Sequence, residues 1–217
     1  MKKIAVVLAG CGFKDGSEIT EAVSALIALS EAGAEYKVFA PDMKIKAVDH
    51  IKFEKTGEER NVLQEAARIA RGKIQNIREL TADAFDGLVM PGGFGAATNL
   101  CSWGSDGANA KVHPEVERVV RDFYQKQKPI AAICIAPAIV AKVLGSQGVT
   151  VTVGASSDTS KEIEKTGAVH EVCAVDDYVT DREHRIITTP AYMYGDAKPH
   201  QLFQGIRGAI RELVEMA

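Results

Sequence analysis

The chain has 217 residues, of which 46% are hydrophobic and 25% charged, and its net charge is −3 at neutral pH. These values are typical of one globular domain that spans residues 1–217 and has a sizeable core. The chain lacks the basic excess of nucleic-acid-binding proteins, and no apolar run approaches the roughly 18 residues that a membrane span needs. None of its four cysteines forms a C-x-x-C pair, so neither a zinc site nor a disulfide framework is indicated. We therefore expect a reducing cytoplasmic location and no nucleic-acid or membrane partner.

The first half of the chain alternates short apolar runs with amphipathic segments. The predicted strands cover residues 4–8, 36–40 and 87–90. The predicted helices cover residues 18–32 and 62–71, with Ser17 and Asn61 as their N-caps. A weaker alternation around a Lys-Thr-Gly-Glu turn predicts a small peripheral hairpin within residues 43–59.

The second half continues the alternation. The predicted strands cover residues 130–133, 149–153, 172–179 and 185–189. The predicted helices cover residues 114–127, 137–144, 160–166 and 199–216. The turn at residues 181–184 suggests an antiparallel excursion beside a final central strand. The whole pattern predicts an α/β fold with a doubly wound, mostly parallel sheet, whose ligand crevice lies beyond the carboxyl ends of the strands.

The strongest candidate for a reactive group is Cys134, at the changeover from an apolar strand to an Ala-rich helix. A nucleophile on such a sharp turn needs small neighbours, and Ala132 and Ala136 meet that need. The positive end of the helix favours a thiolate, so we expect a pKa for Cys134 well below that of a free cysteine. Taken alone, the pattern fits a small core residue equally well, as most lone cysteines are.

Backbone donors and carboxylates are expected near this cysteine nucleophile elbow. Gly92 and Gly93 can expose N–H groups that stabilise an oxyanion together with the N–H of Ile135. Glu18 and Glu21 lie in the first turn of the first long helix, so either carboxylate can project into the same crevice. Acidic residues also favour that end of a helix for electrostatic reasons alone. Glu21 is the better functional candidate of the two.

Several other residues lie near predicted strand ends and are candidates for the pocket wall. They are Cys11, Cys101, Trp103, Thr189, Tyr192 and Tyr194. For the two cysteines, ordinary thiol behaviour without a role is the more common outcome, and aromatic residues near loops more often pack or form subunit contacts.

Five stretches carry a resemblance to a known family. They are VVLAGCGFKDGSEITEAV at residues 6–23, NVLQEAARIARG at 61–72, MPGGFGAATNL at 90–100, ICIAPAI at 133–139 and IITTPAYM at 186–193. With these motifs the chain resembles the DJ/PfpI superfamily of flavodoxin-like cysteine proteins, which are relatives of the class I glutamine amidotransferase domain. The branch that it resembles most is ElbB (enhancing lycopene biosynthesis, sigma cross-reacting).

The resemblance implies a flavodoxin-like fold with Cys134 as the nucleophile and Glu21 as the buried glutamate that contacts the sulfur. It implies a glutathione-independent glyoxalase, a lyase that converts small 2-oxoaldehydes such as methylglyoxal and glyoxal to 2-hydroxy acids without a cofactor or a metal. Relatives commonly form homodimers, so a homodimer is expected.

One departure from the family pattern bears on the chemistry. Many members place a histidine directly after the cysteine or at the end of the next strand, where this chain has Ile135 and approximately Gly154. His170 and His184 read as solvated or strand-edge residues. An amidotransferase or protease triad, which needs a positioned base, is therefore less expected.

Two other functions remain open at this stage. Cys134 could be oxidised reversibly in a non-enzymatic, redox-responsive or chaperone-like binding protein. A glutaminase half of an amidotransferase would need a synthase partner and a histidine that the sequence does not place. Only a glyoxalase releases free acid at more than one equivalent per site.

Overall fold

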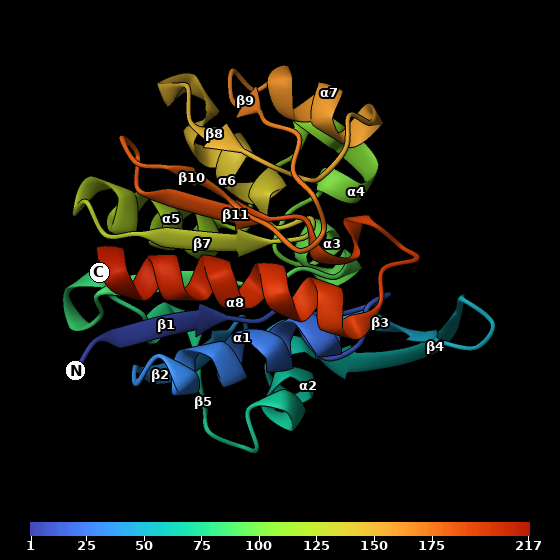
Figure 1. The fold of residues 1–217 in the computed structure, drawn as a ribbon. Coiled ribbons are helices and arrows are strands. Elements are labelled where there is room, and N and C mark those ends of the chain that lie inside the picture. Colours follow the sequence, from blue (N-terminus) through green and yellow to red (C-terminus); the bar gives the residue numbers. More distant parts are fainter.

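A seven-stranded sheet with helices on both faces forms the centre of the computed structural model, which describes residues 1–217 (Figure 1). Its strand order is β10-β11-β7-β6-β1-β2-β5. The strands are β1 (Lys3–Val7), β2 (Glu35–Ala40), β5 (Ile74–Asn76), β6 (Gly87–Met90), β7 (Ile130–Ile133), β10 (Val179–Asp181) and β11 (Ile186–Thr189). Only β10 runs antiparallel to its neighbour, β11. The predicted flavodoxin-like, mostly parallel α/β fold is confirmed.

The buried strands separate two apolar clusters, one on each face of the sheet. Along β1, Ile4 and Val6 belong to the cluster under one helix layer, while Ala5 and Val7 belong to the cluster under the other. Successive side chains of a strand point to opposite faces. Because both faces are covered, the central strands read in the sequence as continuous apolar runs and not as alternating ones.

One helix layer consists of α1 (Ile19–Glu31), α2 (Val62–Ile69) and α8 (Pro199–Met216), with α8 lying alongside α1 (Figure 1). None of the helices combines the length and apolar character that crossing a membrane requires. The N-cap of α1 is Glu18, whose carboxylate accepts the N–H of Glu21 at 2.6 Å. The predicted cap, Ser17, instead accepts the N–H of Ala9 through its hydroxyl oxygen, which fixes the loop after β1. Asn61 caps α2 as predicted.

The other helix layer contains α5 (Pro114–Gln125) and α6 (Pro137–Leu144). Three shorter helices, α3 (Phe94–Thr98), α4 (Trp103–Asp106) and α7 (Asp158–Glu164), lie toward the carboxyl ends of the strands (Figure 1). The sequence did not predict α3, α4 or the edge strand β5, because elements of three to five residues are too short to show a periodic pattern.

Two smaller sheets lie outside the central one. Strands β3 (Lys44–Asp49) and β4 (Glu54–Asn61) form the predicted hairpin, which stands away from the body of the protein (Figure 1). Phe53, in the turn between the two strands, packs against the loop after β1. Its ring lies 5.8 Å from that of Phe13 in an edge-to-face arrangement. Strands β8 (Thr150–Val151) and β9 (Val169–His170) pair with each other only.

The predicted strand at residues 172–179 is wrong. Only its last residue, Val179, is part of a strand, and most of the rest of the segment is irregular and exposed. The hydroxyl of Thr189 donates to the carbonyl of Asp177, so a side chain of the sheet replaces a strand partner there. The antiparallel excursion around residues 181–184 is confirmed, but it is shorter than expected.

Candidate active site

Cys134 occupies a strained turn between β7 and α6. Its backbone has a positive φ of 62°, which few residues other than glycine adopt. Its N–H donates to the carbonyl of Thr189 at 2.9 Å, which ties the turn to the end of β11. Ala132 and Ala136 on either side are fully buried, so larger side chains would not fit. A strained cysteine at the carboxyl end of a central strand is the geometry of a nucleophile elbow.

Two backbone N–H groups approach the sulfur of Cys134, those of Gly93 and Ile135. Neither of them donates to another protein group. Gly93 has a φ of 94°, and a Cβ there would lie 2.4 Å from the nitrogen of Glu18, so only glycine allows this approach. The N–H of Gly92, which we expected to join them, instead donates to Glu21 at 3.1 Å. Its predicted place in an oxyanion hole is therefore corrected.

Glu21 is fully buried beside Cys134. Its carboxyl oxygens accept N–H groups from two different segments, Gly92 at 3.1 Å and Tyr192 at 3.3 Å. Burial raises the pKa of Glu21 to about 8, and the nearby charge of Glu18 acts in the same direction. Near neutral pH this carboxyl group is therefore close to its titration point, where it can both accept and donate a proton.

The thiol of Cys134 differs from the expectation of a low pKa. Burial raises the pKa of Cys134 well above its ordinary value, and a charged Glu21 beside it acts in the same direction. The N–H groups of Gly93 and Ile135 lower the pKa but do not outweigh these effects. Helix α6 follows Cys134 as the prediction assumed, but burial removes the water that would stabilise the thiolate. The resting group is a thiol, and any attack by the sulfur requires that its proton be removed.

A cleft with a volume of about 580 Å³ opens over this pair. Its wall includes most of the predicted residues, namely Glu18, Glu21, Gly93, Trp103, Cys134, Ile135 and Tyr192. Glu18 is partly buried there, and burial raises its pKa, although the N–H of Glu21 counteracts the effect. No histidine, lysine or arginine lines the cleft.

Four predicted wall residues lie elsewhere. Cys101 is buried, and its thiol donates to the carbonyl of Ala96 at 3.3 Å. Cys11 lies next to the charged side chains of Glu65 and Arg68, and burial together with Glu65 raises its pKa. The hydroxyl of Thr189 is buried and points to Asp177, although its carbonyl holds the Cys134 turn. The hydroxyl of Tyr194 donates to the carbonyl of Cys173 at 2.8 Å. These residues lie near the strand ends where the sequence placed them, but their side chains do not reach the cleft.

The structure adds wall residues that sequence reasoning missed. They are Phe13, Phe94, Ala97, Gly104, Ser105, Gly107, Asp158, Thr159, Glu162 and Met193. Phe13 lies in a glycine-rich loop, and Phe94, the first residue of α3, directly follows Gly92 and Gly93. A large apolar side chain beside such glycines is unusual, and that was a usable signal. Asp158, Thr159 and Glu162 come from α7, whose distance in the sequence gave no such signal.

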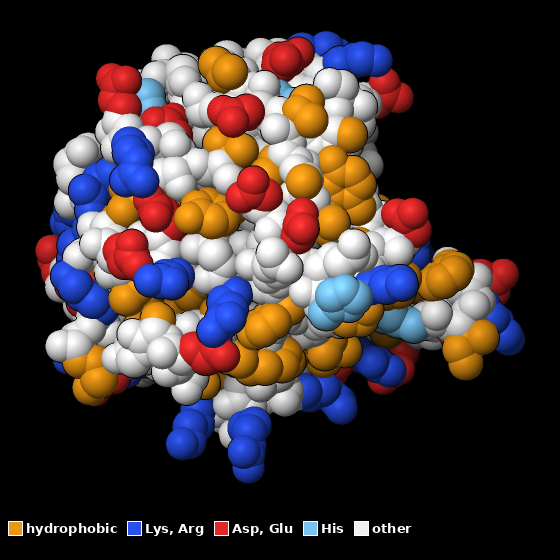
Figure 2. Space-filling view, in the orientation of Figure 1, with side chains coloured by type: hydrophobic (Ala, Val, Ile, Leu, Met, Phe, Trp, Pro, Cys, Tyr) orange, Lys and Arg blue, Asp and Glu red, His pale blue; other side chains and the backbone are white.

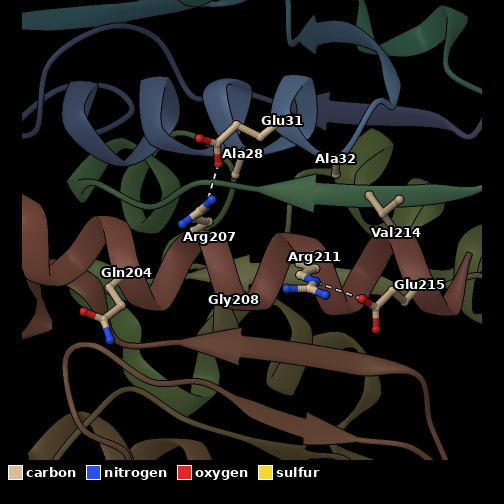
Figure 3. Close-up of a pocket in the computed structure, with 9 residues that line it drawn as sticks. All are labelled: Ala28, Glu31, Ala32, Gln204, Arg207, Gly208, Arg211, Val214 and Glu215. Carbon is tan, nitrogen blue, oxygen red and sulfur yellow. Dashed lines mark hydrogen bonds and ion pairs between the residues drawn. The ribbon is translucent and has the colours of Figure 1, made fainter.

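A second hollow, of about 520 Å³, lies between α1 and α8 (Figure 3). Its charged side chains are already paired: Arg207 bonds to Glu31 at 2.7 Å and Arg211 to Glu215 at 3.0 Å. It shares no residue with the cleft over Cys134 and contains no nucleophile. No group of three or more His, Cys, Asp or Glu side chains in the structure could hold a metal ion.

Comparisons with known proteins find a matching family model and several relatives. Residues 2–189 match the model of the DJ-1/PfpI family. A human protein named glutamine amidotransferase-like class 1 domain-containing protein 3, mitochondrial, is 44% identical over 99% of this chain and 83% of its own length. The zebrafish ES1 protein, mitochondrial, is 32% identical over 98% of this chain and 85% of its own.

Solved structures extend the likeness. An isoprenoid biosynthesis protein with an amidotransferase-like domain from Ehrlichia chaffeensis is 40% identical, with a TM-score of 0.93 over 100% of this chain and 99% of its own. Drosophila DJ-1beta, at 20% identity and a TM-score of 0.56 over 100% of this chain and 95% of its own, shares the fold.

The predicted cytoplasmic location is contradicted by these comparisons, because the human, rat and zebrafish relatives are all named mitochondrial proteins. The four free cysteines indicated only a reducing compartment, which does not distinguish one such compartment from another. The family model covers most of the chain, and relatives above 30% identity cover nearly all of it. The chain belongs to the DJ-1/PfpI family.

Proposed function

We propose that the protein is a cofactor-free, glutathione-independent glyoxalase of the ElbB-like branch, which converts 2-oxoaldehydes to 2-hydroxy acids. The observation that carries the proposal is the buried Glu21 carboxyl beside the Cys134 thiol, in a cleft without a histidine. A glyoxalase needs a nucleophile for the aldehyde and one group that moves a proton between adjacent carbons. It needs no separate acid for a leaving amine, which is the role of histidine in a triad.

The first step forms a hemithioacetal. As the sulfur of Cys134 bonds to the aldehyde carbon, the Glu21 carboxylate takes the thiol proton. The carbonyl π electrons move to oxygen, and this alkoxide lies near the free N–H groups of Gly93 and Ile135. Glu21 then gives its proton to the alkoxide, which restores the carboxylate. A raised pKa at Glu21 suits it for both halves of this transfer.

The second step isomerises the adduct, and the third releases it. Glu21 removes the proton from the carbon that bears sulfur. The C–H electrons form the C=C bond of an enediolate, and the π electrons of the neighbouring carbonyl move to its oxygen. The hydroxyl proton on the sulfur-bearing carbon passes to that oxygen, and Glu21 returns its proton to the neighbouring carbon, which gives a 2-hydroxyacyl thioester on Cys134. Water then adds to the thioester, the C–S bond breaks, and the thiol and the free acid are regenerated. The sum is one aldehyde and one water converted to one hydroxy acid.

The test is lactate formation from methylglyoxal by the purified protein, treated with EDTA and free of added thiol. We expect several equivalents of lactate per site, none from Cys134→Ser, and little from Glu21→Gln. Thr189→Ser, which keeps the hydroxyl outside the cleft, is the control and should retain activity. Lactate that appears only with glutathione, or full activity in Cys134→Ser, would contradict the mechanism.

The redox-responsive alternative predicts a different result from the same assay. A binding protein that uses Cys134 oxidation would release no more than one equivalent of acid per site. Peroxide would convert its sulfur stepwise to sulfenic and sulfinic acids. Because the thiol of Cys134 is buried and its pKa is raised, the reactive thiolate is scarce, and this favours the glyoxalase.

A further inference from the structure

We propose that the substrate of this site is an uncharged 2-oxoaldehyde that carries an aryl or branched alkyl group in place of the methyl group of methylglyoxal. The proposal rests on the glyoxalase function above and adds to it the class of substrate.

The cleft is too large for methylglyoxal alone. Its volume of about 580 Å³ lies within the roughly 300–1,000 Å³ range of pockets that bind drug-sized ligands. A space of this size would hold on the order of 20 waters at liquid density. A molecule with only a few heavy atoms bound at Cys134 would leave most of that water, and most of the wall, without contact.

Beyond the reacting pair, large apolar side chains form much of the wall. Phe94 and Trp103 contribute aromatic rings, and Met193 contributes a flexible thioether. Phe94 is 52% exposed, whereas Phe39 and Phe123 are buried. An exposed ring at the wall of a cleft is the kind of surface that an apolar ligand covers.

The ring of Phe94 is held in place before any ligand arrives. Its backbone N–H donates to the carbonyl of Phe13 at 2.7 Å. The ammonium group of Lys14 lies 4.5 Å from the centre of the ring and also contacts Phe13 and Phe53. An ordered ring loses little conformational entropy when a ligand packs against it, so more of the contact energy appears as binding.

The charges of the cleft disfavour an anionic substituent. Its ionisable wall residues are four carboxylic acids, Glu18, Glu21, Asp158 and Glu162, with no basic group among them. A carboxylate or phosphate on the substrate would lose its hydration and find no basic wall residue to pair with. A cation is not favoured either, because Asp158 already pairs with Lys161 at 3.0 Å and Glu162 pairs with Lys165.

Turnover of three aldehydes tests the proposal. Phenylglyoxal is uncharged and aryl, methylglyoxal is uncharged and small, and 4-carboxyphenylglyoxal is aryl and carries a carboxylate. Contacts remote from the reacting carbon can be used in the transition state. We expect kcat/KM for phenylglyoxal to exceed that for methylglyoxal roughly tenfold or more, as burial of an aromatic ring predicts. The turnover of 4-carboxyphenylglyoxal should fall well below that of phenylglyoxal.

Phe94→Ala should reduce kcat/KM for phenylglyoxal more than for methylglyoxal, so that the ratio of the two falls severalfold. The matched control is Phe53→Ala. This removes a ring that also contacts Lys14 but lies outside the cleft, and it should leave the ratio unchanged. Equal or better turnover of methylglyoxal, or a ratio that Phe94→Ala does not change, would overturn the inference and leave the glyoxalase proposal intact.

A binding measurement separates this inference from the proposed function. Trp103 is the only tryptophan of the chain and lines the cleft, so its fluorescence reports occupancy. Acetophenone, which has the aryl ketone but no aldehyde, should change this fluorescence at far lower concentration than acetone does, and less effectively in Phe94→Ala. If no aldehyde is turned over but acetophenone binds in this way, the glyoxalase fails and the apolar ligand class stands. If acetophenone and acetone bind alike, the ligand class fails.

Discussion

Glu21 and Gly92 meet at a contact that leaves no room for a side chain. The N–H of Gly92 donates to Oε2 of Glu21 at 3.1 Å, and a Cβ on Gly92 would lie 2.8 Å from that oxygen and 2.6 Å from the Cβ of Cys134. Gly92→Ala should therefore displace the two reacting groups relative to each other and abolish most turnover. Strain of this kind typically costs about 1–3 kcal/mol of stability.

The matched control for this substitution is Gly195→Ala, since nothing lies within 4 Å of a Cβ at that position. Chemical denaturation and methylglyoxal turnover, measured on both variants, check the prediction. Wild-type activity in Gly92→Ala would show that the distance between the carboxyl and the sulfur is not critical.

The pH dependence of turnover should follow Glu21. The proposed mechanism needs its carboxylate, and the pKa of Glu21 is about 8. kcat/KM should therefore rise about tenfold per pH unit well below pH 8 and level off above it. The thiol of Cys134 titrates at higher pH, since burial raises its pKa, and so does not produce this rise. A rate that falls as the pH increases from 6 to 8 would argue for a neutral carboxyl as the active form.

Glu21 should also make stability depend on pH. Its folded pKa, about 8, lies above the ordinary value of 4.5, so the folded state keeps a proton that the unfolded state loses between these values. Wild-type stability should fall as pH rises through that window, by on the order of 5 kcal/mol for the full difference. Glu21→Gln cannot titrate and should lack this fall, although it loses one N–H acceptor at every pH.

Denaturant titrations at pH 5 and pH 8 measure this difference directly. Glu35→Gln, at an exposed position on β2, is the control. Its free energy of unfolding should change between pH 5 and pH 8 by the same amount as that of the wild type. If the unfolding free energy of Glu21→Gln changes with pH as much as that of the wild type, Glu21 is already ionised at pH 5.

The homodimer that the family resemblance implies remains a prediction, and α1 offers a face for it. Ile19, Val23 and Ile27 are spaced four residues apart on α1 and are 47%, 39% and 47% exposed. Figure 2 shows apolar side chains gathered over this helix. Ile27→Glu should convert a dimer to a monomer in light-scattering measurements. Ile51→Glu, at the 90% exposed hairpin tip, should not. A wild-type protein that is monomeric at high concentration would contradict the prediction.

The sequence predicted the central sheet because its strands are buried on both faces. Residues 87–90 and 130–133 form strands with the bounds that their apolar runs indicated, and α6 follows at residues 137–144. Short elements such as α3, α4 and β5 were missed because they have no long, fully buried apolar run that would indicate them. The segment at residues 172–178 contains two β-branched residues, Val172 and Val175, but side-chain bonds such as that from Thr189 replace its ladder.

The candidate site was predictable in position but not in electrostatics. Strand ends indicated Cys134, Gly93 and Ile135, because the carboxyl ends of parallel strands meet at one edge. The pKa of Cys134 depends on how much water reaches the sulfur, and a linear pattern does not report that. Side-chain direction was also hidden: Tyr192 faces the cleft, whereas Tyr194, two residues later, turns to Cys173.

The positive φ of Cys134 means that backbone and chemistry favour different residues at one position. Glycine would adopt this conformation without the strain of about 1 kcal/mol or more that a Cβ brings. Selection for stability alone would therefore tend to replace the cysteine, and the reactive thiol persists only under selection for activity. In a library screened for thermal resistance without an activity requirement, Cys134→Gly should be enriched. Cys134 is therefore a position at which thermal stability is given up for a reactive side chain.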